Sequence, residues 1–544
     1  MGMATVMAME TIMASNTARL YILLILGSLV PHHAMSGEVK ASPRVSLMHV
    51  HTDYLNIGNQ DPVSDQISEL KASLNLQSIG SNVEGYLNYE YLQREYADYD
   101  QFSDGFDNYN GQLLLKFLDN KFTTLLAAQQ GRQQSSLTSP VSEFSLIGLG
   151  EVTTYNMTNR LSSHLNDIVN YDIQWRISDT QVDSVSDIEE IDFRNATNQL
   201  VNIAFTDGDF FTRSYWSLNA SYIDIDYDSE QESQPATQRS NTFSAEIGHG
   251  IVDNISIFAK YYDEDYDVVR QSQSLTSSSY GAGLRWNPSS RSYFQMAYNW
   301  AQDDLNDNFL SAKLNWQPSS RTSLLLSSSK RFFGDAYEAQ FSYRHKRIAS
   351  NISYTETVQN FQIATLRPSV VGNFICPNTP AFTIDQCRFS AGQTPTVGSG
   401  EQLVPVNGFE QELNNTTYLD KNLNASLSYQ FRKAKALLTI NRSRRTNIEI
   451  ALETEIEAIS LSTSYRLARH HNFNLSMKYT HFDTLSQSAS ATEYRQQDYD
   501  IRYNHSLGRT LLLTVRYNHR QRESNVATND FDENIVTLSI SKEF

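Results

Sequence analysis

The end of this chain is defined by a strict alternation of apolar and polar residues that runs up to a terminal aromatic residue. One side of the alternation holds four apolar residues: Val536, Leu538, Ile540 and Phe544. Successive side chains of a β-strand point to opposite sides, so this segment predicts a strand with one apolar and one polar face. A terminal aromatic residue on such a strand is typical of the closing strand of an outer-membrane barrel. We therefore expect these four residues to act as the barrel-assembly signal.

The same alternation recurs from Pro43 onward, in strands of about 9 to 14 residues, the length expected of strands that cross a membrane. Examples are residues 294–300, 423–431 and 473–480. Short turns and longer loops alternate as the connections between successive strands. Eleven short turns and the two chain ends delimit twelve hairpins. The sequence therefore predicts an all-β fold, a transmembrane antiparallel up-and-down β-barrel of about 24 strands, with 22 or 26 strands as alternatives.

Charge is distributed unevenly along the chain. The formal net charge is −18, which excludes nucleic acid as a partner because no basic groove can form. The longer loops are acidic: residues 178–192 carry six acids and no base. Outer-membrane barrels have short turns that face the periplasm and long loops that face outward. Because this chain has the same pattern of connections, we expect it to lie in the cell outer membrane. Asp224, Asp226 and Asp228 alternate in a way that fits either a Ca²⁺ site or simply a soluble acidic loop.

The first 36 residues are interpreted as a signal peptide, followed by the barrel over residues 37–544. Arg19 precedes an apolar run from Leu20 to Val30, which is too short for a membrane-spanning helix. Small residues before Gly37 fit a cleavage site, and an N-terminal anchor is the alternative. The first strand is expected near Arg44, which leaves no room for the N-terminal plug of a TonB-dependent receptor.

The segment from about residue 359 to residue 415 differs from every other connection. It contains five prolines and the two cysteines of the chain, Cys376 and Cys387. An exported protein meets an oxidising compartment, so we expect these cysteines to form a disulfide. Loops of this length are usually functional or disordered. We predict one large loop, either extracellular or folded into the lumen, that narrows or gates one end of the barrel.

Charged residues also occur on the polar faces of the predicted strands, where they are expected to line the lumen. They are Arg285, Lys313, Arg344, Asp498, Asp500, Arg502 and Arg516. Rings of Arg and Lys would select anions. The alternative is a wall of mutually neutralised charges that only braces the barrel, because lining charges commonly pair with one another.

No catalytic motif is present: the chain has no Gly-x-Ser-x-Gly, phosphate loop or His-Glu-x-x-His. We therefore expect a protein that is not an enzyme, with no catalytic, cofactor-binding or metal-binding residues and no cofactor.

Two turn motifs, at residues 285–291 and 315–322, repeat thirty residues apart and share the sequence Pro-Ser-Ser-Arg. They are followed by residues 331–337, 343–347 and 353–356. This run resembles the outer-membrane β-barrel family associated with exosortase/PEP-CTERM and exopolysaccharide systems of Gram-negative bacteria. The repeats by themselves are explained by turn chemistry, in which proline fixes φ and serine satisfies backbone groups.

The resemblance implies a surface-polysaccharide or exosortase-linked export system, in which the barrel acts as a conduit or as an assembly or docking platform. The expected partners are outer-membrane lipids and lipopolysaccharide, the barrel-assembly machinery, and periplasmic polysaccharide-export components. The alternatives are a general diffusion porin and the barrel sheath of a multihaem electron conduit.

Overall fold

The computed structural model describes most of the chain between residues 38 and 544. The described residues are 38–55, 63–100, 103–134, 144, 149–163, 168–184, 195–227, 237–268, 273–302, 307–359, 367–377, 388–390, 401–410, 418–447, 452–485, 492–508, 510–526 and 529–544. The predicted signal peptide lies outside them. No helix in these ranges is long and apolar enough to span a membrane.

The described residues form 27 β-strands. The first nine are β1 (Glu38–Leu55), β2 (Val63–Ile79), β3 (Val83–Tyr96), β4 (Asp104–Phe117), β5 (Phe122–Gln134), β6 (Leu149–Ser163), β7 (Val169–Ser184), β8 (Ala196–Asp207) and β9 (Ser214–Tyr227). The next nine are β10 (Thr237–Val252), β11 (Ile255–Val268), β12 (Gln273–Ser289), β13 (Ser292–Ala301), β14 (Phe309–Ser319), β15 (Thr322–Arg331), β16 (Gly334–His345), β17 (Ile348–Gln359) and β18 (Arg367–Pro377). The last nine are β19 (Arg388–Ser390), β20 (Glu401–Glu410), β21 (Tyr418–Gln430), β22 (Ala434–Asn447), β23 (Glu453–Ala468), β24 (His471–Leu485), β25 (Glu493–Leu507), β26 (Leu511–Ser524) and β27 (Phe531–Glu543).

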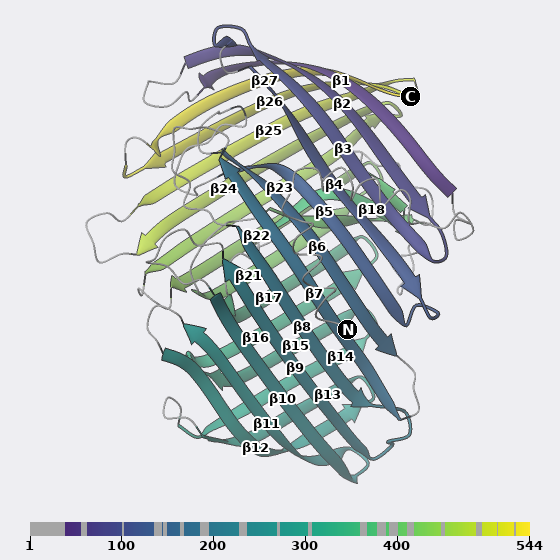
Figure 1. The fold of residues 1–544 in the computed structure, drawn as a ribbon, viewed down its shortest axis with the longest axis vertical. Coiled ribbons are helices and arrows are strands. Elements are labelled where there is room, and N and C mark those ends of the chain that lie inside the picture. Colours follow the sequence, from purple (N-terminus) through teal and green to yellow (C-terminus); the bar gives the residue numbers. More distant parts are fainter. Residues whose placement is uncertain are drawn as a thin grey trace, which may run out of the picture.

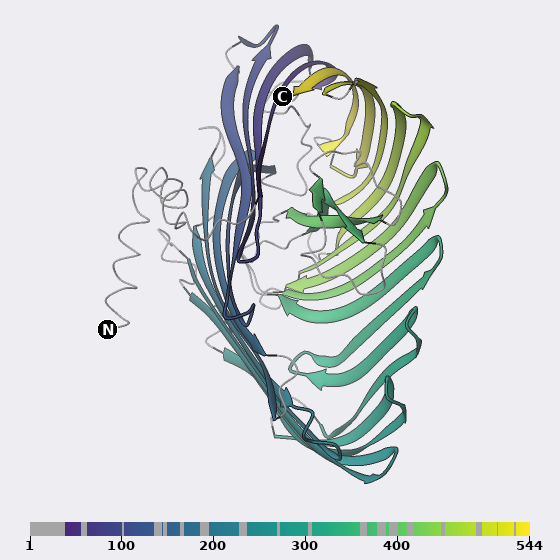
Figure 2. The same ribbon diagram turned by 90° about the vertical axis from the view of Figure 1, so that its right-hand side faces the viewer.

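Twenty-four of these strands form one closed antiparallel barrel, as predicted (Figure 1). Each strand pairs with the next along the chain, β17 pairs with β21, and β27 pairs back with β1. Closure removes the free sheet edges that would otherwise expose unpaired backbone groups, which a lipid environment does not tolerate. Figure 2 shows the two walls of the ring, which separate in the middle and meet at both ends.

The alternation seen in the sequence divides each wall into an outward and an inward face. On β13, Phe294, Met296 and Trp300 are exposed, whereas Gln295 and Asn299 are buried. The exposed apolar residues form the belt that contacts lipid, because the barrel interior is the polar side in this architecture. On β27 and at Phe544, which directly follows it, the predicted assembly residues Val536, Leu538, Ile540 and Phe544 belong to this belt, and all of them are exposed.

The Pro-Ser-Ser-Arg repeats form the β12–β13 and β14–β15 turns. In each turn a serine hydroxyl accepts a hydrogen bond from the backbone N of the arginine two residues later. The distances are 3.4 Å for Ser289 and Arg291 and 3.2 Å for Ser319 and Arg321. Both repeats therefore form a tight turn with the same serine–arginine hydrogen bond, which agrees with the turn chemistry expected from the sequence.

Several strands are longer than the sequence predicted. β1 begins at Glu38 rather than near Arg44 and has 18 residues. β7 extends to Ser184 and β9 to Tyr227, so parts of the two acidic segments assigned to loops belong to strands. Strand pairing continues past the apolar belt: polar residues on both faces hide the alternation at the end of β7, and at the end of β9 the acidic residues alternate with Ile225 and Tyr227.

The long connection between β17 and β21 contains a separate antiparallel sheet with the order β19–β18–β20. Both views place this small sheet within the outline of the barrel, and in Figure 2 it lies between the two walls. The sequence predicted one long loop at this position but not its strands, because its alternation is weak. Cys376 lies on β18, and Cys387 lies outside the described residues.

Candidate functional site

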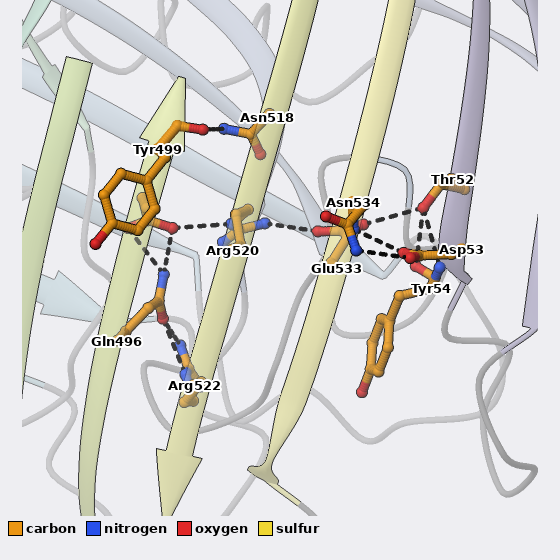
Figure 3. Close-up of polar contacts among 11 residues, drawn as sticks. Thr52, Asp53, Tyr54, Gln496, Tyr499, Asn518, Arg520, Arg522, Glu533 and Asn534 are labelled. Atoms are coloured by element: carbon orange, nitrogen blue, oxygen red, sulfur yellow. Dashed lines mark hydrogen bonds and ion pairs between the residues drawn. The ribbon is translucent and has the colours of Figure 1, made fainter. Parts of the chain in front are cut away.

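The inward face of the ring is the candidate site, and its most continuous charged region lies on β25, β26, β27 and β1 (Figure 3). Arg520 of β26 stands between two acids: its Nε is 3.1 Å from Asp498 Oδ1, and its Nη1 is 3.4 Å from Glu533 Oε2. Glu533, which is fully buried, also accepts a hydrogen bond of 3.3 Å from the hydroxyl of Thr52. This chain of contacts crosses the junction between the last strand and the first.

A second arginine extends the same network. Arg522 donates from Nε and Nη2 to Gln496 Oε1, at 2.9 and 2.7 Å. Gln496 in turn donates to both carboxylate oxygens of Asp498, at 3.0 and 3.1 Å. The guanidinium of Arg522 also lies over the ring of Tyr494, 4.2 Å from its centroid, and 5.2 Å from that of Phe531. Buried charges arranged in this way are satisfied by their neighbours and stiffen the wall.

Four of the seven predicted lumen residues meet in this region. Asp498 belongs to the network above, and Asp500 pairs with Arg516. Arg502 lies on the same strand with its Nη2 3.7 Å from Asp500 Oδ1. The sequence missed Arg520 and Arg522. They follow Arg516 at the same even-numbered positions, so extending the alternation of β26 past Asn518 would have found them.

The other three predicted residues lie elsewhere around the ring. Arg285 of β12 stacks over the rings of Tyr215 and Tyr293, at 4.7 and 4.0 Å. Lys313 of β14 lies opposite Gln295, and Arg344 of β16 lies opposite Ala349. The seven charges therefore do not form one ring of like sign, which is the arrangement that anion selection requires.

Part of the interior is bridged by contacts between strands that are not neighbours. Arg331 of β15 pairs with the fully buried Glu264 of β11. Lys260 of β11 donates to Ser311 of β14 at 2.7 Å. Neighbouring strands are about 4.8 Å apart, so strands three steps apart in a flat sheet would be separated by about 14 Å. The wall must curve sharply here to bring the side chains together.

Glycines leave room for aromatic rings on this side of the barrel. A Cβ on Gly248 would lie 2.3 Å from the ring of Tyr215, and one on Gly283 would lie 2.7 Å from the ring of Phe258. Each ring therefore occupies the space beside a glycine, on β10 and on β12. A third contact, in which Gln295 of β13 donates to Glu246 of β10 at 2.7 Å, completes the bridge. We refer to this part of the barrel, from β9 to β15, as the bridged side.

The wall formed by β21, β22, β23 and β24 has a different character. Many of its inward positions carry uncharged hydrogen-bonding side chains: Asn422, Asn424, Ser426 and Ser428 on β21, Thr439 and Asn441 on β22, Ser460 and Ser462 on β23, and Ser476 on β24. Lys478 of β24, opposite Ser460, is a charged residue on the same face. Register partners share a face, and Asn424 lies opposite Asn441 whereas Thr439 lies opposite Ser460. We call this set the hydroxyl–amide wall.

Hydrogen bonds link the members of the hydroxyl–amide wall to one another. Asn441 donates to Asn424 Oδ1 at 2.5 Å, and Asn424 donates to Asn422 Oδ1 at 2.7 Å. The hydroxyls of Ser462 and Ser476 are 3.3 Å apart. None of these side chains is buried, so the wall is open to water and to a polar ligand. The up-and-down topology predicted from the sequence already made these consecutive strands neighbours, but it did not give the register that places Asn424 opposite Asn441.

A buried apolar cluster lies against the inward face of β1, β2, β3 and β27. It consists of Val50, Leu55, Ile67, Tyr96, Phe144 and Ile535. Phe144 belongs to the connection between β5 and β6, and its backbone oxygen accepts a hydrogen bond of 3.0 Å from the hydroxyl of Tyr96. One residue of that connection is therefore anchored inside the barrel.

The acidic triplet considered for Ca²⁺ is not assembled by the described residues. Asp224 pairs with Arg239 at 3.0 Å, and Asp228 lies outside the described ranges. Within the part of the chain that the structure describes, no group of three or more His, Cys, Asp or Glu side chains could hold a metal ion.

A closed antiparallel barrel of 24 strands with an apolar outer belt and a polar interior is the architecture of an integral outer-membrane protein. The chain is therefore an outer-membrane β-barrel of the Gram-negative type. No protein-family model matches it, and no curated protein matches its sequence. The resemblance to the exosortase-associated family stays a prediction.

Solved structures with a similar layout are outer-membrane receptors and transporters. The FrpB iron transporter of Neisseria meningitidis is 12% identical over 94% of this chain and 82% of its own, with a TM-score of 0.45. The siderophore receptor PirA of Acinetobacter baumannii is 11% identical over 93% and 81%, with a TM-score of 0.44. The ferric-catecholate import receptor Fiu of E. coli is 9% identical over 93% and 82%, with a TM-score of 0.41. The likeness says nothing about what this chain carries.

Proposed function

We propose that this outer-membrane barrel serves a surface-polysaccharide export system, of the exosortase-linked kind that its sequence resembles, as a conduit or docking platform. The observation that carries the proposal is the hydroxyl–amide wall. Sugar hydroxyls exchange hydrogen bonds with Ser, Thr and Asn side chains, each of which both donates and accepts. A run of such residues across four adjacent strands offers a hydrated polymer many equivalent contacts.

The distribution of charge supports a neutral or weakly charged cargo over small ions. On β25 to β27, Arg520 and Arg516 are paired with Asp498, Glu533 and Asp500. A wall of paired charges exerts little net field on passing ions, whereas a selective ion pore uses rings of unpaired charge. The paired charges of β25 to β27 brace the barrel, and the hydroxyl–amide wall is the surface that contacts the cargo.

Two features favour a restricted passage over a general diffusion porin. The small sheet of β18, β19 and β20 lies within the outline of the ring. The bridged side is crossed by the Arg331–Glu264 and Lys260–Ser311 contacts. A porin needs an open aqueous channel, whereas a polymer conduit must stay closed when it is empty.

The test is single-channel recording in planar bilayers with neutral dextran oligosaccharides as the probe. The intact chain should show small conductance steps, and a chain lacking residues 365–410 should show larger ones that dextran blocks transiently. Replacing Asn424 and Asn441 by leucine should make the blockades several-fold rarer. The matched control is Asn219→Leu, an inward asparagine of β9 on the bridged side, which should leave the blockades unchanged.

Two outcomes would replace the proposal. A large steady conductance of the intact chain without dextran blockades would identify a general diffusion porin. Haem absorbance that copurifies with the barrel would identify the sheath of an electron conduit.

A further inference from the structure

Two histidines of neighbouring strands meet near one end of the barrel. His471 begins β24, and His505 lies directly opposite it on β25. Their Nδ1 atoms are 2.9 Å apart, and the two rings meet nearly edge to face, at 64°. The hydroxyl of Tyr503 is 2.6 Å from the same Nδ1 of His471.

The position of this histidine pair follows from the alternation of its strands. On β24 the even-numbered Phe482 faces inward and is buried against Tyr494, so the odd-numbered His471 faces outward. His505 likewise alternates with the inward Asn504. Both histidines lie beside the β23–β24 turn, at the end of the barrel that carries the short turns. That end faces the periplasm.

We propose that His471 and His505 form a binding site for a divalent transition-metal ion, with Cu²⁺ or Ni²⁺ preferred over Zn²⁺. Neutral imidazole is the commonest protein ligand for such ions. Metal–nitrogen bonds are about 2.0–2.1 Å long. Two nitrogens 2.9 Å apart therefore subtend an angle of about 90° at a metal ion bound to both.

That angle sets the preference among metals. About 90° is the angle between adjacent ligands in the square-planar and tetragonal geometries of Cu²⁺ and Ni²⁺. Tetrahedral Zn²⁺ requires a wider angle and hence a larger separation of the two nitrogens. Water supplies the remaining ligands. The hydroxyl of Tyr503 contacts the same Nδ1 of His471, so this contact must open when that nitrogen binds the metal ion.

The experiment titrates the purified full-length barrel in detergent with Cu²⁺ and records its electron paramagnetic resonance spectrum. The wild-type protein should bind one equivalent with a tetragonal spectrum split by two nitrogen ligands. His471→Ala and His505→Ala should each abolish that species. Tyr503→Phe removes the hydroxyl that competes for Nδ1 of His471, so this variant should bind Cu²⁺ at least as tightly as the wild type.

The matched control is His470→Ala, which removes the neighbouring imidazole of the same turn and should leave the spectrum and stoichiometry unchanged. Heat-modifiable migration verifies that each variant has folded. Unchanged Cu²⁺ binding in the variant that lacks both His471 and His505 would overturn the proposal. So would a wild-type spectrum without nitrogen splitting, or tighter binding of Zn²⁺ than of Cu²⁺ and Ni²⁺.

Discussion

Asn534 of β27 donates two hydrogen bonds to Asp53 of β1, from its backbone N to Oδ1 at 2.6 Å and from its side-chain Nδ2 to Oδ2 at 2.8 Å. The two residues are 481 positions apart in the sequence, and their contact lies on the outward face of the junction that closes the ring (Figure 3). On the inward face of the same junction Thr52 contacts Glu533. The first and last strands are thus joined on both sides of the sheet.

We predict that Asp53→Ala weakens this junction. The change removes both acceptors, and hydrogen bonds to a charged group contribute about 1.5–3 kcal/mol each, with solvent exposure placing this pair at the low end. The temperature at which the folded band is lost in semi-native electrophoresis should fall. Asp53→Asn keeps one acceptor oxygen for the backbone N of Asn534 and should have a smaller effect. Equal melting of Asp53→Ala and wild type would contradict the prediction.

Deleting Phe544 should impair assembly rather than the function of the folded barrel. Its ring is 66% exposed on the outward face, and its backbone N donates to Pro43 O at 3.0 Å. The deletion removes the terminal aromatic residue and one bond of the junction. Surface levels and heat-modifiable migration measure the result, and Phe544→Tyr, which keeps an aromatic ring, should assemble normally. Normal surface levels of the truncated chain would refute the assembly role.

Arg331→Ala should destabilise the bridged side strongly. The variant leaves the fully buried Glu264 without its guanidinium partner, and breaking a buried ion pair in this way costs about 3–5 kcal/mol. The double variant Arg331→Met with Glu264→Gln removes both charges and should recover much of the loss. A double-mutant cycle of thermal midpoints measures the coupling. Additive effects of the two single variants would show that the pair does not brace the barrel.

Removing residues 365–410 should raise single-channel conductance and leave barrel assembly intact. The deletion takes out the whole small sheet, and β17 pairs with β21 independently of it, so the ring stays closed. Conductance in planar bilayers measures the effect. Unchanged conductance of a correctly folded deletion variant would remove the gating role and leave the segment as a surface or partner-binding element.

Cys376 and Cys387 should form a disulfide. In the described part of β18 and β19, Ile375 pairs with Arg388 and Phe374 with Phe389. In the sequence Cys376 directly follows Ile375, and Cys387 directly precedes Arg388. A bridge over so short a loop stabilises it by about 2–3 kcal/mol in the chain-entropy account. Thiol labelling of the native, non-reduced protein should find no free thiol, and labelling of both cysteines would refute the bridge.

The sequence by itself determined the class of fold and predicted about 24 strands with 22 or 26 as alternatives, and the structure confirms 24 strands in the barrel. The alternation that ends at Phe544 recurs in every wall, and a period of two cannot be satisfied by a helix. Turn residues such as the Pro-Ser-Ser-Arg repeats marked the short connections, and their count gave 24 strands. Strand ends were less predictable: beyond the apolar belt both faces of β7 are polar, and on β9 the acidic residues that suggested a loop are one face of the strand.

Only the tertiary structure decided which side chains meet. The strands of the hydroxyl–amide wall are consecutive in the sequence, but the register that places Asn424 opposite Asn441 and Thr439 opposite Ser460 is set only in the paired sheet. The contact of Arg331 with Glu264 depends on the sharp curvature of the bridged side, and that of Thr52 with Glu533 depends on ring closure. Periodicity gives the face on which a residue lies, but register and curvature, which arise from the whole sheet, set the distance between residues on different strands.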